Sequence, residues 1–421
     1  MKSSPSLWRN ADFRGLWASV VISTYGSMLR GSAMIYAAIF LLHAPPADIG
    51  ILRLAELIPA FLTGLVAGVW VDRMRRRPVL IGADLLRAAA LVTVPLAAWL
   101  GILSFPHLLL TAAVVSALGV FFDVAYEAFL PSLLPNRNLI EANSKITAGA
   151  AVMEALSFSS GGWLVQLISA PATLAIDALT FVGSAAFISR VHDAETGGPE
   201  ATDTESPATF LQEAVEGIRA TWRQPLLRGM ILAALGINAG FGVFGTSMIY
   251  YLNQRVGFDP GVLGMIFAIG GLSSLAGALL AQRISHARLG LVMIGALVLT
   301  VIGQAFVPLA SEVGLLAIAL LVGQQLLTDG ALTLFDINQV SLRQAITPAH
   351  LLGRVNACAR VAEFGAILAG TLLATVTSEV VGLRASLWLG VGFTALAVVG
   401  LVLSPVRDID HIPAVPVEVT P

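Results

Sequence analysis

The sequence predicts an all-α membrane protein with twelve transmembrane helices in two pseudo-symmetric six-helix bundles. Of the 421 residues, 57% are hydrophobic and only 12% are charged, and the mean hydropathy is +0.84. Soluble domains carry about 25% charged residues, so this composition is typical of a chain that lies in lipid. Two further observations support the prediction: long apolar runs separated by short connections, and residues that recur at a constant offset between the halves.

Each apolar run is long enough to cross the hydrocarbon core as a helix, which takes about 20 residues. The first six runs cover 14–42, 47–71, 79–101, 107–132, 144–169 and 171–190. The last six cover 227–252, 260–283, 289–310, 312–340, 354–378 and 382–403. We therefore expect an N-terminal bundle over 1–190, a central cytoplasmic loop over 191–226, a C-terminal bundle over 227–404 and a cytoplasmic tail over 405–421.

The central loop has two parts of different character. Its first part is acidic and rich in Gly, Pro and Thr, which predicts a mobile connection. In its second part, Phe210, Ala214, Ile218 and Trp222 recur every four residues. This spacing predicts an amphipathic helix at the membrane surface, with a packed regulatory helix as the alternative.

The basic residues predict the orientation. With both termini in the cytoplasm, 18 of the 24 Lys and Arg residues lie on the cytoplasmic side, whereas the opposite loops hold only Arg255 and Arg384. Because cytoplasmic loops are enriched in Lys and Arg, we expect a multi-pass protein of the cell inner membrane with both termini cytoplasmic. Only Lys2 and Lys145 are lysines, which argues against nucleic acid as a partner.

The two halves repeat each other at an offset of 213 residues. Four positions show the repeat: Asp123, Pro135, Asn143 and Gly82 recur as Asp336, Pro348, Asn356 and Gly295. A constant offset through separate helical regions indicates that a six-helix unit was duplicated.

The connection between the second and third runs, GVWVDRMRRR at 68–77, has the spacing G-x-x-x-D-R-x-x-R-R. This spacing resembles the signature loop of major facilitator superfamily transporters, which implies the major facilitator fold. Three stretches are similar to its drug and siderophore exporters, such as enterobactin exporters and macrolide efflux proteins: 68–88, 177–187 and 338–357. One position departs from the family pattern, because Arg75 stands where the family usually has Gly.

The resemblance implies a secondary active transporter that exports hydrophobic or amphipathic small molecules by alternating access, with the substrate bound between the halves. It also implies an inner gate formed by Gly68, Asp72, Arg73, Arg76 and Asp123. We expect Asp72 to accept hydrogen bonds from N–H groups that open the eleventh helix, near 353–356, when the inner side is closed. The alternative is that the arginines only anchor the topology.

Ionisable residues inside the spans point to coupling. Such a group costs at least about 2.5–3.5 kcal/mol at the bilayer centre, so it needs a partner or a role. Three pairs are spaced to neutralise each other on one helix face: Arg53–Glu56, Asp84–Arg87 and Arg360–Glu363.

Four ionisable residues have no such neighbour: Arg30, Glu127, Glu154 and Asp329. A carboxylate shielded from water binds a proton more readily than one in water. We therefore expect Glu127, Glu154 or Asp329 to carry a coupling proton, with Arg30 tuning one of them, and sodium as the alternative ion. A structural inter-helix ion pair is the competing explanation for each.

Aromatic and methionine side chains are the candidates for the substrate cavity, because adaptable apolar walls suit bulky cargo. They are Tyr25, Met28, Phe122, Tyr126, Phe241, Phe244, Met248 and Phe335. The same residue types also occur in cores and on lipid-facing surfaces.

Several function classes lack their motifs. The sequence has no HExxH, no GxxxxGK[ST], no convincing Ser/His/Asp set and a single cysteine, Cys358. We therefore expect no metal, no cofactor and no enzyme activity, and a monomer whose partners are a small-molecule substrate, protons or sodium, and membrane lipid. The alternatives are a transporter of lysophospholipid or another lipid, a non-transporting sensor and, least favoured, an intramembrane enzyme.

Overall fold

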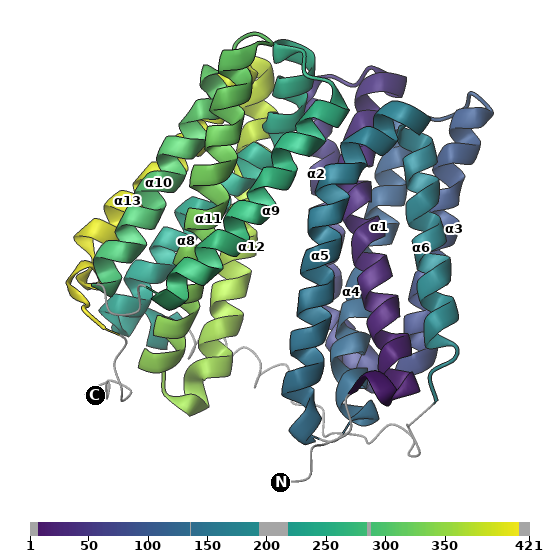
Figure 1. Ribbon diagram of the computed structural model, residues 1–421, viewed down its shortest axis with the longest axis horizontal. Coiled ribbons are helices and arrows are strands. Elements are labelled where there is room, and N and C mark those ends of the chain that lie inside the picture. The colour runs from purple at the N-terminus through teal and green to yellow at the C-terminus, as the bar shows by residue number, and fades with distance from the viewer. Residues whose placement is uncertain (1–6, 135, 193–217, 284–287, 412–421) are drawn as a thin grey trace. The chain divides into compact units, whose positions relative to one another are not determined.

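The computed structural model describes residues 7–134, 136–192, 218–283 and 288–411, which are nearly all helical (Figure 1). Contacts divide the chain into two compact units. The first unit comprises Met1–Thr202 and Asp259–Met265, and the second comprises Asp203–Phe258 and Ile266–Pro421. The bundle, loop and tail boundaries expected from the sequence stay a prediction.

In the first unit, long helices pack side by side around a buried apolar core (Figure 1). The helices are η1 (Leu7–Arg9), α1 (Ala11–Leu42), α2 (Pro46–Asp72), α3 (Arg76–Trp99), α4 (Phe105–Leu133), α5 (Asn136–Ile168) and α6 (Ala170–Ile188). Helix α1 packs against α5 and α6, whereas α4 packs against α2 and α3. The Asn10 side chain starts α1 by accepting hydrogen bonds from the N–H groups of Asp12 and Phe13.

The second unit has the same kind of architecture. It holds α8 (Pro225–Tyr250), which continues into the π-helical turn η2 (Tyr251–Val256), and α9 (Pro260–Arg283), α10 (Leu289–Leu309), α11 (Leu315–Ile346), α12 (Ala349–Val380), α13 (Leu383–Leu403) and η3 (Pro405–Asp408). Helix α8 packs against α12 and α13, and α10 packs against α11 and α13. Residues 218–223, before α8, are also helical.

Eleven helices in the described part of the chain are long and apolar enough to cross a membrane, so the protein is a multi-pass membrane protein. The span expected at 144–169 lies in α5, which has 33 residues but is too polar to meet the same criterion. Residues 218–223 agree with the end of the expected amphipathic helix, whereas Phe210 and Ala214 lie outside the described residues.

The offset of 213 residues also relates whole helices. The helices α3, α5 and α6 begin at 76, 136 and 170, and α10, α12 and α13 begin at 289, 349 and 383. The prolines inside α3 and α10, Pro95 and Pro308, follow the same offset. Pro135, one of the repeated residues, lies outside the described part. Equivalent positions in the two units can therefore be compared residue by residue.

Candidate functional site

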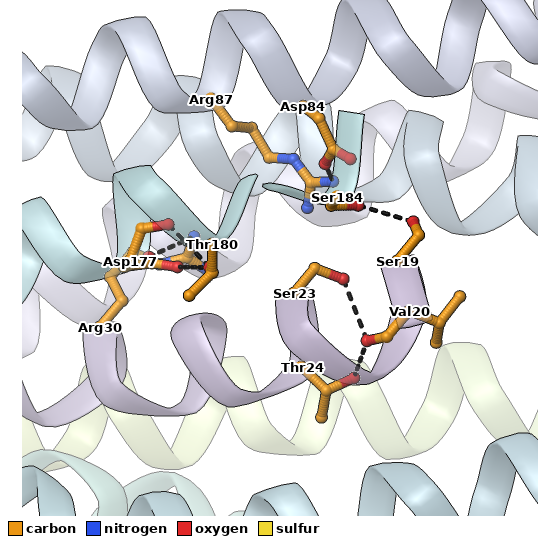
Figure 2. A network of polar contacts seen from close by, with 10 residues as sticks. All are labelled: Ser19, Val20, Ser23, Thr24, Arg30, Asp84, Arg87, Asp177, Thr180 and Ser184. Atoms are coloured by element: carbon orange, nitrogen blue, oxygen red, sulfur yellow. Dashed lines mark hydrogen bonds and ion pairs between the residues drawn. The ribbon is translucent and has the colours of Figure 1, made fainter. Parts of the chain in front are cut away.

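Four ionisable side chains gather where α1, α3 and α6 meet in the first unit (Figure 2). They are Arg30 on α1, Asp84 and Arg87 on α3, and Asp177 on α6. Asp84 and Asp177 are completely buried, and Arg87 is 5% exposed. Buried charges are strongly unfavourable unless each has a partner, so the contacts among these residues decide how the interface is tolerated.

Arg87 is held by an acid and two aromatic rings. Its Nη2 donates a hydrogen bond to Oδ1 of Asp84 on the same helix, which confirms the expected ion pair (Figure 2). The guanidinium carbon lies 4.6 Å from the ring centroid of Phe122 and 4.2 Å from that of Phe181. Contacts of this kind are attractive, since the negative face of each ring attracts the cation. Arg87 therefore joins α3 to both α4 and α6.

Arg30 pairs with Asp177 across the α1–α6 interface. Its Nη1 lies 3.8 Å from Asp177 Oδ2, and Thr180 Oγ1 donates to Asp177 Oδ1 at 3.3 Å (Figure 2). Gly26, one turn before Arg30, makes this approach possible. A Cβ atom at Gly26 would lie 2.2 Å from Asp177 Oδ1 and 2.1 Å from Thr180 Oγ1. A side chain at this position would therefore separate the two helices.

Hydroxyl groups close the same interface further along α1. The Oγ atoms of Ser19 and Ser184 lie 2.6 Å apart, within hydrogen-bond distance, while Ser23 and Thr24 donate to the Val20 carbonyl within α1 (Figure 2). Short polar side chains permit close packing of membrane helices and bridge them by hydrogen bonds.

In the second unit, the half-buried Asp329 on α11 faces α9. A Cβ atom at Gly270 on α9 would lie 1.9 Å from Asp329 Oδ2, so the carboxylate rests against bare backbone. One turn earlier on α11, Gln325 Nε2 donates to the Phe267 carbonyl at 3.2 Å. Within the described residues, no ion pair or hydrogen bond involves the Asp329 carboxylate.

The other proposed coupling residues lie in different surroundings. Glu127 on α4 and Glu154 on α5 are exposed, whereas Asp329 is half-buried. The expectation that Arg30 lacks a partner and tunes one of these acids needs correction, because its ion pair is with Asp177. Spacing along one helix cannot reveal a pair between helices. The available signal was that Asp177 also has no basic neighbour on its own helix.

A second correction concerns Glu363. It pairs with Arg343 of α11, with 3.7 Å between Nη1 and Oε1, instead of with Arg360 on its own helix. Arg360 is exposed, so its long side chain extends away from Glu363. The expected Arg53–Glu56 pair does form, at 3.3 Å.

The residues expected to form the inner gate surround the end of α2. Arg73 caps α2 and is exposed, Arg76 opens α3 and is half-buried, and Asp123 is exposed on α4. A Cβ atom at Gly68 would meet nothing within 4 Å, so no helix approaches closely there in this structure. The Asp72 side chain lies outside the described residues, and the gate stays a prediction.

Arg77 has a role beyond anchoring topology. Its Nε donates to the Ile188 carbonyl at 3.3 Å, and its Nη2 donates to the Ser189 carbonyl. These bonds attach the loop between α2 and α3 to the end of α6, whose last carbonyls lack partners within the helix.

The candidate cavity residues fall into two groups. Phe122, Phe244 and Phe335 are buried within their own units. The other five are exposed or half-buried: Tyr25, Met28, Tyr126, Phe241 and Met248. Among these, the Tyr25 hydroxyl lies 2.8 Å from Ser160 Oγ, which links α1 to α5. In the described residues, no group of three His, Cys, Asp or Glu side chains could hold a metal ion.

Comparison with known proteins identifies the family. Residues 16–334 match the family described as Major Facilitator Superfamily. The chain belongs to this superfamily. It is 26% identical over 348 residues to the uncharacterised MFS-type transporter y4rN of Sinorhizobium fredii, covering 81% of this chain and 83% of the relative. It is 27% identical over 377 residues to the multidrug efflux pump Tap of Mycolicibacterium fortuitum, covering 86% and 88%.

The fold agrees with this membership in the major facilitator superfamily. The crystal structure of the nucleoside transporter NupG superposes with a TM-score of 0.72, covering 93% of this chain and 98% of NupG. Sequence identity to NupG is 13%, so the similarity concerns the fold alone. The chain is therefore a membrane transporter of the superfamily, and its substrate and coupling ion are matters for proposal.

Proposed function

We propose that this major facilitator superfamily member is a secondary active transporter that exports hydrophobic or amphipathic small molecules in exchange for protons. The observation that carries the proposal is the similarity to the Tap multidrug efflux pump across 86% of the chain. The three stretches similar to drug and siderophore exporters point the same way. In this proposal the protein lies in the cell inner membrane with both termini in the cytoplasm, and its two halves alternate access to a central site.

Asp329 is the proposed proton carrier. Its carboxylate is half-buried against α9 and has no cation partner among the described residues, so its negative charge is poorly compensated. Proton uptake removes that charge, and return to a water-filled access path restores it. Glu127 and Glu154 are second candidates, because both are exposed and their charged forms are better tolerated.

The proposed substrate surface consists of the side chains that do not pack inside a unit: Tyr25, Met28, Tyr126, Phe241 and Met248. Aromatic and methionine side chains adapt to ligands of different shapes, which suits a multidrug transporter. We assign the inner gate to Gly68, Asp72, Arg73, Arg76 and Asp123, on the resemblance of the 68–77 loop to the signature loop.

Transport by the purified protein in liposomes tests this function. A fluorescent lipophilic cation is supplied, and a proton gradient or a sodium gradient is imposed separately. We expect dye to accumulate only when the proton gradient drives exchange. Asp329→Asn removes the accumulation but retains dye binding, and the exposed acid Glu312, outside the spans, provides the matched control as Glu312→Gln. Accumulation driven by sodium, or undiminished in Asp329→Asn, contradicts the proposed coupling.

A further inference from the structure

A groove with a volume of about 470 Å³ lies within the second unit, at the start of α8 and α12. Helical residues 218–223 form one edge, and the first half of α8 and the beginning of α12 form the walls. The walls are mainly apolar and include Ile231, Leu235 and Val361. We call this feature the interfacial groove. It contains none of the residues assigned above to the gate, to coupling or to substrate binding.

The depth of the interfacial groove matches one leaflet of a bilayer. Arg228 lies three residues past the start of its span at Pro225, and Arg354 lies three residues past the start of its span at Leu351. At the other end, Leu235 lies ten residues past Pro225. At 1.5 Å per residue, the groove therefore runs from the headgroup level to roughly 15 Å inside the membrane, about half of the hydrocarbon core.

The charge of the groove is one-sided. Its lining includes Arg228, which is exposed, and Arg354, which is half-buried, and it includes no acidic residue. Both arginines lie in the first turns of their helices, where the helix dipole also favours an anion. A ligand that complements the groove therefore has an anionic head and an apolar tail.

The groove is accessible from the lipid. Val361 is 51% exposed and Leu232 is 44% exposed, although both lie inside predicted spans. Trp222, on the 218–223 edge, is 54% exposed at the level where Trp is enriched in membrane proteins. A molecule already in the leaflet can enter sideways without crossing water.

We propose that the interfacial groove binds an anionic phospholipid of the cytoplasmic leaflet, with an acyl chain along α8 and α12 and the phosphate between Arg228 and Arg354. Each arginine near an anionic headgroup strengthens binding by about fivefold, so the two together give roughly a thirtyfold preference over a zwitterionic lipid. The assignment to the cytoplasmic leaflet rests on the proposed orientation, whereas lipid binding itself is independent of the transport function.

The single cysteine offers a direct probe, because Cys358 lines the groove and is half-buried. The rate at which N-ethylmaleimide labels the detergent-solubilised protein is measured with added phosphatidylglycerol or phosphatidylcholine. We expect phosphatidylglycerol to protect Cys358 at roughly thirtyfold lower concentration than phosphatidylcholine. In the double variant Arg228→Gln/Arg354→Gln the two lipids should protect equally. Arg255→Gln, an exposed arginine at the far end of the same span, should retain the preference.

Native mass spectrometry gives a readout that does not depend on thiol chemistry. It counts the phosphatidylglycerol molecules that remain on the intact protein. Val361→Trp fills the groove without changing its charge and should remove the same lipid that the double arginine variant loses. Equal protection by both lipids in the wild type, or phosphatidylglycerol retained in both variants, overturns the proposal. Neither assay requires substrate or an ion gradient, so failure here leaves the transport proposal standing.

Discussion

The interface of α1, α3 and α6 in the first unit and that of α8, α10 and α13 in the second occupy equivalent places in the repeated sequence, yet they are built differently. The four charged residues of the first unit are Arg30, Asp84, Arg87 and Asp177, and their counterparts 213 residues later are Val243, Leu297, Thr300 and Gly390. The second set carries no charge. Its side chains are completely buried, and Thr300 donates only to the Ala296 carbonyl of its own helix.

This difference teaches that the fold does not need charges at the interface. Val243 and Gly390 pack where Arg30 and Asp177 form an ion pair, since a Cβ atom at Gly390 would lie 3.1 Å from Val243 Cγ1. Buried ion pairs are frequently no more stabilising than apolar residues of similar volume, so stability alone does not account for the charged version.

The asymmetry is reversed at Asp329, whose counterpart 213 residues earlier is Ser116. The buried acids of the first unit lie beside arginines, whereas Asp329 has no cation partner among the described residues. The two halves have therefore diverged in opposite ways. One half carries compensated charges between its helices, and the other carries an acid that is available for proton exchange in the proposed mechanism.

The largest expected effect comes from breaking the charged interface on one side only. Arg87→Thr introduces the residue of the second unit but leaves Asp84 buried without its arginine. We expect the free energy of unfolding in mixed micelles to fall by about 3–5 kcal/mol. The double variant Asp84→Leu/Arg87→Thr reproduces the pair Leu297 and Thr300, and it should recover most of the loss. A double variant as unstable as Arg87→Thr would show that the two interfaces are not interchangeable.

Crowding the α1–α6 contact should have the next largest effect. Gly26 corresponds to Ala239 in the second unit, but a Cβ atom at Gly26 would clash with Asp177 and Thr180. We expect Gly26→Ala to lower the unfolding free energy by about 1–3 kcal/mol through overpacking. Gly31, on the same helix, is the matched control because nothing lies within 4 Å of its Cβ position. Gly31→Ala should be neutral or stabilising, and equal losses in both variants would exclude the clash as the cause.

The contribution of the arginine–ring contact can be isolated with an equivalent pair of phenylalanines. Phe122 and Phe335 are related by the 213-residue offset and are both buried, but only Phe122 lies under a guanidinium among the described residues. Both Phe→Leu changes lose packing, and Phe122→Leu also loses the cation–π attraction. We expect its destabilisation, measured by thermal unfolding in detergent, to exceed that of Phe335→Leu by about 0.5–2 kcal/mol. Equal losses would mean that the contact contributes nothing measurable.

The smallest effect is expected at the partly exposed pair on α2. Arg53 and Glu56 are 33% and 15% exposed and correspond to the apolar Ile266 and Ile269 in the second unit. Removing both charges with Arg53→Gln/Glu56→Gln should change the unfolding free energy by about 0–1 kcal/mol, because exposed ion pairs stabilise little. A loss comparable to that of Arg87→Thr would place this pair among the essential buried charges.

Most of the fold could be predicted from the sequence, because apolar length and repeat spacing are local properties. The runs at 79–101 and 171–190 correspond closely to α3 and α6. The limit appeared at α5, where length suggested a span but the helix is too polar to meet the hydropathy criterion. Polar side chains there, such as Ser157 and Ser160, lie on a helix whose packing determines which of them face lipid.

The charge pairs show what local spacing can and cannot reveal. Asp84–Arg87 and Arg53–Glu56 were predictable, since both partners share one helix face. Arg30–Asp177 and Arg343–Glu363 were not, because their partners come from helices whose rotation is set by tertiary packing. The interfacial groove was also invisible in the sequence, since it depends on how three separate segments meet.

The most direct test of proton-coupled export is proton release from the purified protein in weakly buffered detergent solution, upon addition of cationic, neutral or anionic hydrophobic compounds. Asp329→Asn, Glu127→Gln, Glu154→Gln and the control Glu312→Gln are measured beside the wild type. We predict that one class of compound releases protons from the wild type and from Glu312→Gln, and that Asp329→Asn binds the compound without release. Binding without proton release in the wild type, or unchanged release in Asp329→Asn, would contradict the account.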